Sequence, residues 1–387
     1  MKLLNLSCYF NHHQKPLADA MYSILKDDYR FVETTGVPEF RKKLGYQEIS
    51  APYVIKYNDQ TKETIDRMIM DADVVIYGEA PLKLIKKRYN SGKLTLRDDE
   101  SRYKNPNRYL KWPVYTYNSH WINKGYLLCA SAYAPIDYMF SGIKPSKCFR
   151  WGYFTEVKKY DSPEALIENK GLKHPQGVSI LWVGRLIGLK HPESAILVAK
   201  RLKQDGVDFT LDIIGTGKLE GALKRMIQES CLEDCVHLLG SMTPAEVRTH
   251  MEEADIFLFT SDRCEGWGAV LNESMNSGCA VVSDENIGST RYLIENGKNG
   301  LVFKSTNYND LYQKVKWLVD NPDEMRRIGK QAYLTMLETW NGDVAAKNFI
   351  SLSEALLNGE KMSPISDGPC SQAPLIMRRW KGKFSTL

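Results

Sequence analysis

The segment TSDRCEGWGAVLNESMNSGCAVV combines two acidic side chains with a glycine-rich turn. Glu265 precedes the turn Gly266-Trp267-Gly268, and Glu273 follows on the helix that we expect next. Such a turn lets backbone N–H groups at a helix start approach an anion, and the helix dipole favours negative charge there. Carboxylates flanking a phosphate site can accept hydrogen bonds from sugar and ribose hydroxyls. The alternative is that Glu265 caps the helix and Glu273 is solvated.

Two cations follow another apolar run. VSILWV ends before Gly184, so that Arg185 and Lys190 lie at the carboxyl end of the expected sheet, where open α/β sheets bind ligands. Arginine is a planar fork and lysine a point charge, and together they can clamp a diphosphate. Alone, such cations would be solvated; their place in one sheet with the two glutamates favours binding.

A third run, IIGTGKLEGAL, places Gly215 and Gly217 after an expected strand. It is neither a P-loop, because Leu219 stands where Ser or Thr is needed, nor a G-x-G-x-x-G sequence. Either the backbone approaches a nucleotide closely here, or the glycines form a plain tight turn.

The second half of the chain alternates short apolar runs with segments of helical period, which predicts βαβ units and a parallel sheet. The expected strands are VSILWV, DFTLDII, CVHLLG, DIFLFT, CAVVSD and GLVF. The expected helices begin near Pro192, Leu219, Pro244, Ala269, Ser289 and Asn307, and further helices run from Pro322 and from about Asp343 to Leu357. This half predicts a Rossmann-like domain.

The first half predicts a second domain of the same class. LLNLSCYF, DVVIYG, KLTLR, PVYTYN and YLLCASAYA are expected strands, and Leu17–Leu25 and Thr61–Met70 are expected helices. A chain of 387 residues is too long for one core. We expect an N-terminal domain over 1–165, a ligand-binding domain over 166–340, a helix over 341–358 that packs on the first domain, and a flexible basic tail over 359–387.

Composition excludes several classes. A net charge of +5 without a basic stripe interleaved with aromatics argues against a nucleic-acid partner. Eight scattered cysteines indicate a reducing compartment, and we expect a cytoplasmic protein without a cleaved leader or a transmembrane helix. Cys231, Cys235 and His237 lack a second ligand pair for zinc, and Asp71-Ala72-Asp73 precedes a strand where metal-binding D-x-D follows one. No metal cofactor is expected.

In this order, GRLIGLK, IIGTGKLEGAL, LLGSM and EGWGAVLNE resemble glycosyltransferase family 4, over Val178 to Trp340. The resemblance implies the GT-B fold, with two facing Rossmann-like domains, and retaining transfer from a nucleotide diphosphate sugar without metal. By position, it implies that Arg185 and Lys190 bind the diphosphate, Glu265 the sugar hydroxyls and Glu273 the ribose. Further donor contacts are implied for Gly184, Gly215, Gly217, Met242, Gly266, Trp267 and Gly268.

The N-terminal half departs from the family, because the glycine-rich loop after the first strand is absent. His12, His13 or Gln14 stand there and could face the donor phosphate or the acceptor, with His13 preferred, or could form a surface loop. A later group near the reacting carbon would be Asp98, Asp99 and Glu100, or else His120. We favour Asp99 and Glu100 as catalytic, against a solvated turn.

The function expected is retaining transfer of a hexose-type sugar to a hydroxyl of a glycan or lipid-linked acceptor, in polysaccharide biosynthesis. Arg185, Lys190 and the helix start at Gly268 would stabilise the departing diphosphate. Alternatives are a nucleotide-sugar epimerase and a non-catalytic nucleotide-sugar or glycan-binding protein. The tail PLIMRRWKGKF could hold the protein at the inner membrane face, or be a disordered basic end.

Overall fold

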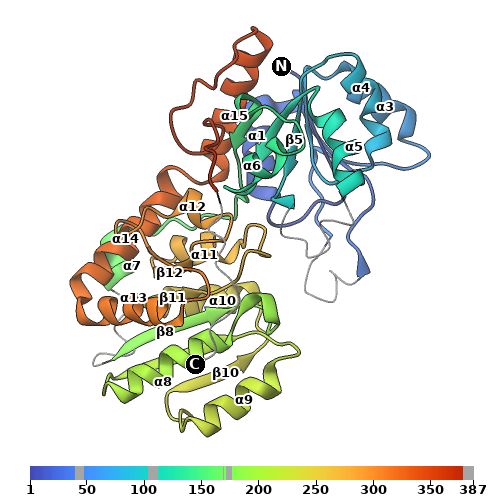
Figure 1. Ribbon diagram of the computed structural model, residues 1–387. Helices are drawn as coiled ribbons and strands as arrows, with labels where there is room; N and C mark the ends of the chain where they lie inside the picture. The colour runs from blue at the N-terminus through green and yellow to red at the C-terminus, as the bar shows by residue number, and fades with distance from the viewer. Residues whose placement is uncertain (40–47, 103–111, 169, 171–176, 378–387) are drawn as a thin grey trace. The chain divides into compact units, whose positions relative to one another are not determined.

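The computed structural model describes residues 1–39, 48–102, 112–168, 170 and 177–377, which form two compact units (Figure 1). The first consists of Met1–Glu156 with Trp340–Met377, and the second of Val157–Thr339. Each unit is built around one parallel sheet.

The sheet of the first unit has seven parallel strands in the order β3-β2-β1-β4-β5-β6-β7. The strands are β1 Leu3–Ser7, β2 Tyr29–Glu33, β3 Val54–Lys56, β4 Val74–Tyr77, β5 Thr95–Asp99, β6 Tyr126–Cys129 and β7 Cys148–Arg150. The central strands are apolar on both faces, as a sheet covered on both sides requires.

Helices cover both faces of this sheet, with α1 and α15 on one side and α3, α4 and α5 on the other (Figure 1). Their bounds are α1 Lys15–Leu25, α3 Lys62–Asp71, α4 Lys86–Asn90, α5 Trp112–Ile122, α6 Ala134–Met139 and α15 Gly342–Leu357, with 3-10 turns η1 Lys26–Asp28, η2 Leu82–Leu84 and η4 Pro145–Lys147. Helix α15 packs on α1 closely enough that a Cβ on Gly342 would lie 2.8 Å from the Pro16 carbonyl oxygen. The last helix thus belongs to the N-terminal unit.

Residues after α15 differ from the expected flexible tail over 359–387. Cys370 and Ser371 are buried, and the Arg150 N–H donates to the Ser371 carbonyl at 2.8 Å. Ala373 N–H donates to the Cys148 carbonyl at 3.0 Å. The expectation is wrong for this stretch because β7 is an edge strand whose free backbone groups need partners. Residues 378–387 lie outside the described residues.

Two expectations for the first half are wrong. PVYTYN is not a strand but the body of α5, although its aromatic and β-branched residues favour strands. YLLCASAYA is a strand only as far as Cys129, since Ala134 begins α6. The helices expected at Leu17–Leu25 and Thr61–Met70 are confirmed as α1 and α3.

The sheet of the second unit has six parallel strands in the order β10-β9-β8-β11-β12-β13. They are β8 Val178–Val183, β9 Phe209–Ile214, β10 Val236–Gly240, β11 Ile256–Phe259, β12 Ala280–Asp284 and β13 Leu301–Phe303. All six apolar runs are therefore confirmed as strands.

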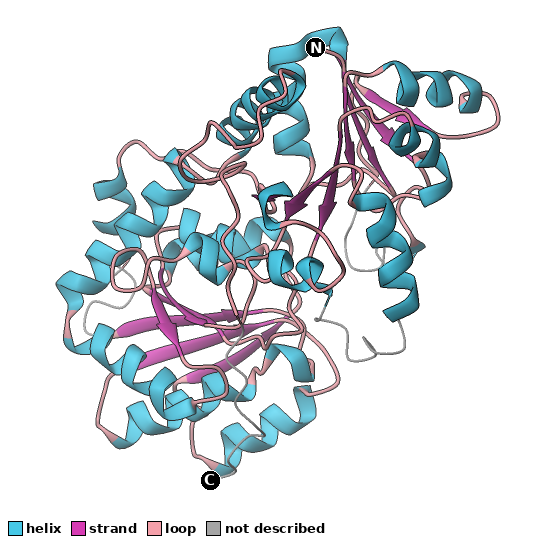
Figure 2. Ribbon diagram, turned by 45° about the horizontal axis from the view of Figure 1, so that its top comes forward, coloured by secondary structure: helices cyan, strands magenta, loops and turns pink. Residues whose placement is uncertain are grey.

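The helices of this unit lie on both faces of its sheet (Figure 2). They are α7 Pro163–Glu168, η5 Gly188–Lys190, α8 Glu193–Gln204, α9 Glu220–Glu229, α10 Pro244–Glu253, α11 Val270–Asn276, α12 Thr290–Leu293, α13 Tyr308–Asp320 and α14 Pro322–Glu338. Every helix start expected in this half is confirmed within a residue or two.

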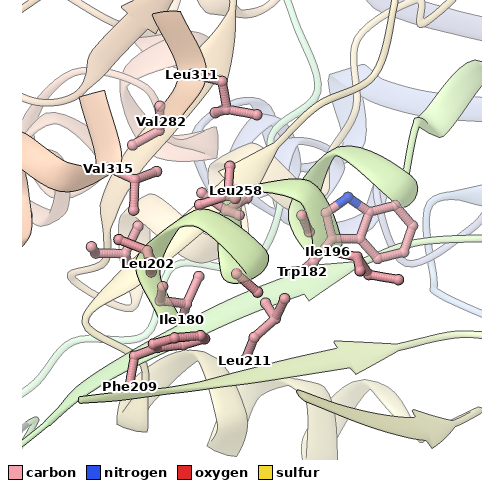
Figure 3. Packing of buried hydrophobic residues seen from close by; sticks show 14 of the residues in the cluster. Ile180, Trp182, Ile196, Leu202, Phe209, Leu211, Leu258, Val282, Leu311 and Val315 are labelled. Atoms are coloured by element: carbon pink, nitrogen blue, oxygen red, sulfur yellow. The ribbon is translucent and has the colours of Figure 1, made fainter. Parts of the chain in front are cut away.

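One core fixes these strands (Figure 3). Ile180, Leu211 and Leu258 on strands meet Leu202 and Val315 on helices, and all are almost completely buried. Each such side chain contributes about 2 kcal/mol of burial free energy. The core therefore holds the strand ends, from which the candidate site projects, in fixed register.

The chain passes from the first unit to the second after Glu156, earlier than the expected boundary after residue 165. Lys158 N–H donates to Asn276 Oδ1 at 2.9 Å, and Tyr160 N–H donates to the Tyr333 hydroxyl at 3.2 Å. These contacts fix 157–165 to the second unit. They join residues far apart in sequence, so local composition did not indicate them.

Candidate functional site

The loops that follow β8 and β9 pack directly on each other. Leu186 N–H donates to the Thr216 carbonyl at 2.9 Å, and Leu219 N–H donates back to the Leu186 carbonyl at 3.0 Å. A Cβ on Gly215 would lie 1.8 Å from the Gly184 oxygen, and one on Gly217 would lie 2.4 Å from the Leu186 oxygen. Loop packing therefore requires a glycine at both positions, as the tight-turn alternative predicts. Contact of these glycines with a donor stays a prediction.

Lys190 and Glu265 form an ion pair between the loops after β8 and β11. Their side chains are only 14% and 15% exposed, so the attraction is less screened than on an open surface. The Ser261 hydroxyl donates a further hydrogen bond to the same Glu265 oxygen at 3.1 Å. The structure thus brings together two residues that the sequence predicted for one site.

Arg185 lies exposed on the loop that carries Lys190. No hydrogen bond or ion pair joins its guanidinium to another residue of the described part of the chain. Five N–H donors are therefore available to an anion at the carboxyl end of the sheet.

The glycine turn before α11 is anchored from inside the unit. Gly268 has φ +82°, and a Cβ there would lie 2.3 Å from Phe259 Cζ. The Trp267 side chain is buried, with its Nε1 donating to Asn272 Oδ1 at 2.8 Å. The indole fills the interior behind the turn, so the expected donor contact of Trp267, through its backbone N–H, stays a prediction.

Glu273 lies in the first turn of α11, a helix of seven residues. Burial raises the pKa of its carboxyl to about 7, against the opposing charge of Arg248. Arg248 donates to the Glu273 carbonyl at 3.3 Å and to Asn276 Oδ1 at 2.9 Å. Among described residues none donates a hydrogen bond to the Glu273 carboxylate. The side chain of Glu273 is half-buried, and its carboxylate is available to accept hydrogen bonds.

Glu265 does not cap α11. The residue at that position is Ala269, and Glu265 N–H instead donates to the Asp262 carbonyl at 3.0 Å. The capping alternative for Glu265 is wrong. Met242, expected beside the base, is half-buried in the turn before α10.

His191, which the sequence analysis did not single out, lies beside the ion pair of Lys190 and Glu265. His191 Nδ1 is 2.7 Å from Glu193 Oε1, and Nε2 is 3.4 Å from Asp262 Oδ2. Burial lowers the pKa of His191, but the Asp262 and Glu193 carboxylates outweigh it and raise the pKa to about 9. The only sequence signal was the position next to Lys190.

In the first unit, the acidic cluster after β5 divides into three environments. Asp98 is half-buried, and its loss of solvation raises its pKa to about 7. The Asp99 carboxylate is held by Arg97 at 3.2 Å and by the Tyr138 hydroxyl, so it is already occupied. Glu100 accepts a hydrogen bond from the Tyr153 hydroxyl at 2.6 Å. Of the two preferred candidates, the contacts of Asp99 indicate a structural role and favour Glu100.

His13 belongs to the same end of that sheet. Its ring stacks on Tyr153 with a centroid distance of 6.3 Å, so His13, Tyr153 and Glu100 form one group. Gln14 donates to the Ser7 hydroxyl at 3.3 Å. His120 is exposed on α5, where its ring packs edge-on against Trp121.

In the part of the chain that the structure describes, no group of three or more His, Cys, Asp or Glu side chains could hold a metal ion. Within the same residues, no helix is both long and apolar enough to cross a membrane.

Comparison with known sequences points to one family. Residues 164–335 match the family model described as "Glycosyl transferases group 1". The amylovoran biosynthesis glycosyltransferase AmsK of Erwinia amylovora is 41% identical over 130 residues, which are 32% of this chain and 32% of that protein. The putative colanic acid biosynthesis glycosyltransferase WcaL of Escherichia coli is 30% identical over 185 residues, 46% of this chain and 45% of its own. The matched segments thus span a third to a half of these relatives.

Solved structures agree on the fold. The Anabaena protein Alr3699/HepE, crystallised in complex with UDP, superposes with a TM-score of 0.68 at 14% identity, covering 92% of this chain and 100% of that one. The lipopolysaccharide outer core galactosyltransferase WaaB gives 0.65 at 16% identity, over 91% and 98% of the two chains. The expected GT-B fold is confirmed. The segment that matches the group 1 glycosyltransferase model, residues 164–335, carries β8 to β13 and the loops of the candidate site.

Proposed function

We propose that this protein transfers a sugar from a nucleotide diphosphate donor to a hydroxyl of a glycan or lipid-linked acceptor, with retention and without a metal cofactor. The observation that carries the proposal is the ion pair between Lys190, in the loop after β8 that also holds Arg185, and Glu265, in the loop after β11 that leads into α11 and Glu273. The names of the relatives AmsK and WcaL, both polysaccharide biosynthesis glycosyltransferases, support an acceptor of this class.

The cations would carry the main catalytic term. Departure of a nucleoside diphosphate leaves negative charge on the phosphates, which Arg185 and Lys190 would stabilise. Lys190 already faces Glu265, so the carboxylate holds the ammonium in place before the donor arrives. Oriented charges of this kind need little reorganisation during the reaction.

The two glutamates would orient the donor. Glu265 retains oxygen lone pairs for sugar hydroxyls beside Lys190, and the unsatisfied Glu273 carboxylate would accept hydrogen bonds from the ribose. Such hydrogen bonds stabilise the ionised form, so donor binding should lower the pKa of Glu273.

On the acceptor side, the group of His13, Tyr153 and Glu100 is the candidate for binding the attacking hydroxyl. In a retaining reaction the hydroxyl would enter from the face of the leaving group, and either the departing phosphate or Glu100 would take its proton. This assignment uses residues of the first unit alone.

The donor can be identified by thermal shift against UDP-, GDP-, ADP- and TDP-sugars, because a ligand that binds only the native state raises its stability. NMR of the anomeric proton of the product then reports retention. Absence of a shift with every nucleotide sugar would contradict the proposal, and conversion of donor without any acceptor would indicate an epimerase.

Arg185→Ala is the first variant to test. Loss of a guanidinium that stabilises the leaving group should lower kcat by about 100-fold or more, while the fold is kept because the side chain is exposed. Arg225→Ala, an equally exposed arginine on α9, is the control and should keep full activity. An unchanged rate in Arg185→Ala removes the arginine from the mechanism.

A further inference from the structure

The two loops that carry the proposed donor-binding side chains are tied together by His191. The residue follows Lys190 in the loop after β8, and its ring reaches the carboxylates of Glu193, at the start of α8, and of Asp262, in the loop after β11. The backbone carbonyl of Asp262 in turn accepts the Glu265 N–H at 3.0 Å. His191 is thus connected by one residue to Glu265 and by one peptide bond to Lys190.

Geometry determines the charge of this imidazole. Ionised carboxylates are acceptors only, so a ring nitrogen that faces one must carry a hydrogen. Because both nitrogens face carboxylates, the ring in this arrangement is the cation.

Two further titratable groups lie near the carboxylates that His191 faces. Tyr308 on α13 interacts with Glu193, and Asp284 at the end of β12 interacts with Asp262. The neighbouring Lys190 is balanced by its partner Glu265.

The backbone shows that this loop end is held by its contacts. His191 has φ 48° and ψ 52°, the left-handed region, which costs a residue other than glycine about 1 kcal/mol. The Thr260 hydroxyl lies 2.8 Å from the Lys190 carbonyl and 3.0 Å from that of His191, and Asp262 N–H donates to the Leu189 carbonyl at 2.9 Å. Hydrogen bonds from the loop after β11 therefore stabilise this strained backbone conformation of His191.

We propose that cationic His191 is a positioning residue of the donor site: it clasps the Lys190 loop to the Glu265 loop, and loss of its proton opens the clasp and weakens nucleotide binding. The inference rests on the proposed function, since it concerns the same site. Nothing in it requires the imidazole to touch the donor.

The direction in which nucleotide affinity changes with pH follows from the raised pKa of His191. Below about pH 9 the ring is charged and the clasp is closed. As pH rises through that value, one ring nitrogen loses its hydrogen, so that its lone pair faces the lone pairs of a carboxylate oxygen and the hydrogen bond is lost. The affinity for a nucleoside diphosphate should then fall about five- to tenfold between pH 8 and pH 10, the usual size of a coupling between sites.

Isothermal titration of UDP into the full chain between pH 7 and pH 10 tests the clasp. His191→Gln should bind about five- to tenfold more weakly at pH 7 and lose the step between pH 8 and pH 10. His191→Arg, which stays charged, should restore binding and keep it to pH 10. His237→Gln is the matched control, since His237 also faces an aspartate, Asp212, at 3.0 Å, and should behave as wild type.

The outcomes separate the two proposals. If wild type binds none of UDP, GDP and ADP, the proposed function fails. If wild type binds and His191→Gln keeps both the affinity and the pH step, the clasp is wrong, because the step then arises from another group. Should His191→Gln fail to fold, a pH step shared by wild type and His191→Arg overturns the clasp equally.

Discussion

At the scale of single residues, the raised pKa of Glu273 predicts how the free energy of unfolding depends on pH. Its pKa is about 7 in the folded protein and near 4.5 when unfolded, so the folded state holds more protons between these values. Stability must then fall as pH rises from about 4.5 to 7 and stay lower above it. Glu273→Gln removes this penalty and should be more stable than wild type at pH 8, on the order of 2 kcal/mol, but not at pH 4.

Urea unfolding of both proteins at the two pH values, without nucleotide, measures this difference. The same variant should bind UDP-sugar about tenfold more weakly, because an amide oxygen accepts hydrogen bonds less strongly than a carboxylate. Equal stability differences at pH 4 and pH 8 would show that the carboxylate is not buried as described.

Single residues also show what the sequence could and could not reveal. Arg185 and Glu265 were found because each stands beside a glycine in a loop that follows an apolar run, and Lys190 and Glu273 because they follow these two at short spacing. The bonds of His191 to Asp262, and of Tyr153 to Glu100, join side chains far apart along the chain. Such pairs leave no periodic pattern, so the sequence did not predict them.

At the scale of elements, the turn before α11 depends on Gly268. Alanine there must adopt φ near +82° and place its Cβ against the Phe259 ring. The two costs together should destabilise the second unit by about 2–4 kcal/mol, measured by chemical unfolding. Gly221→Ala on α9 meets nothing within 4 Å and should be neutral or stabilising. Similar losses in both variants would remove the steric argument.

Elements of the second unit were predictable because its strands are short runs rich in apolar residues and several of its helix starts have a local signal. Thr243 forms a capping box with Glu246, and Asn307 accepts the Asp310 N–H. The first unit lacks such signals: β3 and β7 have three residues each, and α5 is composed of residues that favour strands. Tertiary packing decides those elements, and no window of sequence contains it.

At the scale of the whole molecule, the segment after α15 completes the edge of the first sheet. Removing residues 363–387 should expose the backbone of β7, and amide exchange of Arg150 should rise by at least about tenfold, since its N–H loses the Ser371 carbonyl. Removing only 378–387 is the control and should leave that exchange unchanged. Equal protection of Arg150 in the two truncated proteins would contradict the role given to the segment.

The order of the two units along the chain also affects the order in which they can fold during synthesis. The second unit is one continuous stretch, Val157–Thr339, whereas the first waits for Trp340–Met377. Domains generally fold as units while the ribosome adds about 5–20 residues per second. The later-encoded unit can therefore reach its native state first. Until residues 340–377 emerge, the N-terminal sheet lacks α15 on α1, and the outer edge of β7 lacks its hydrogen bonds to Cys370, Ser371 and Ala373. An open strand edge is a site for pairing with another chain, so we expect this interval to be the one in which the nascent chain is most exposed to aggregation.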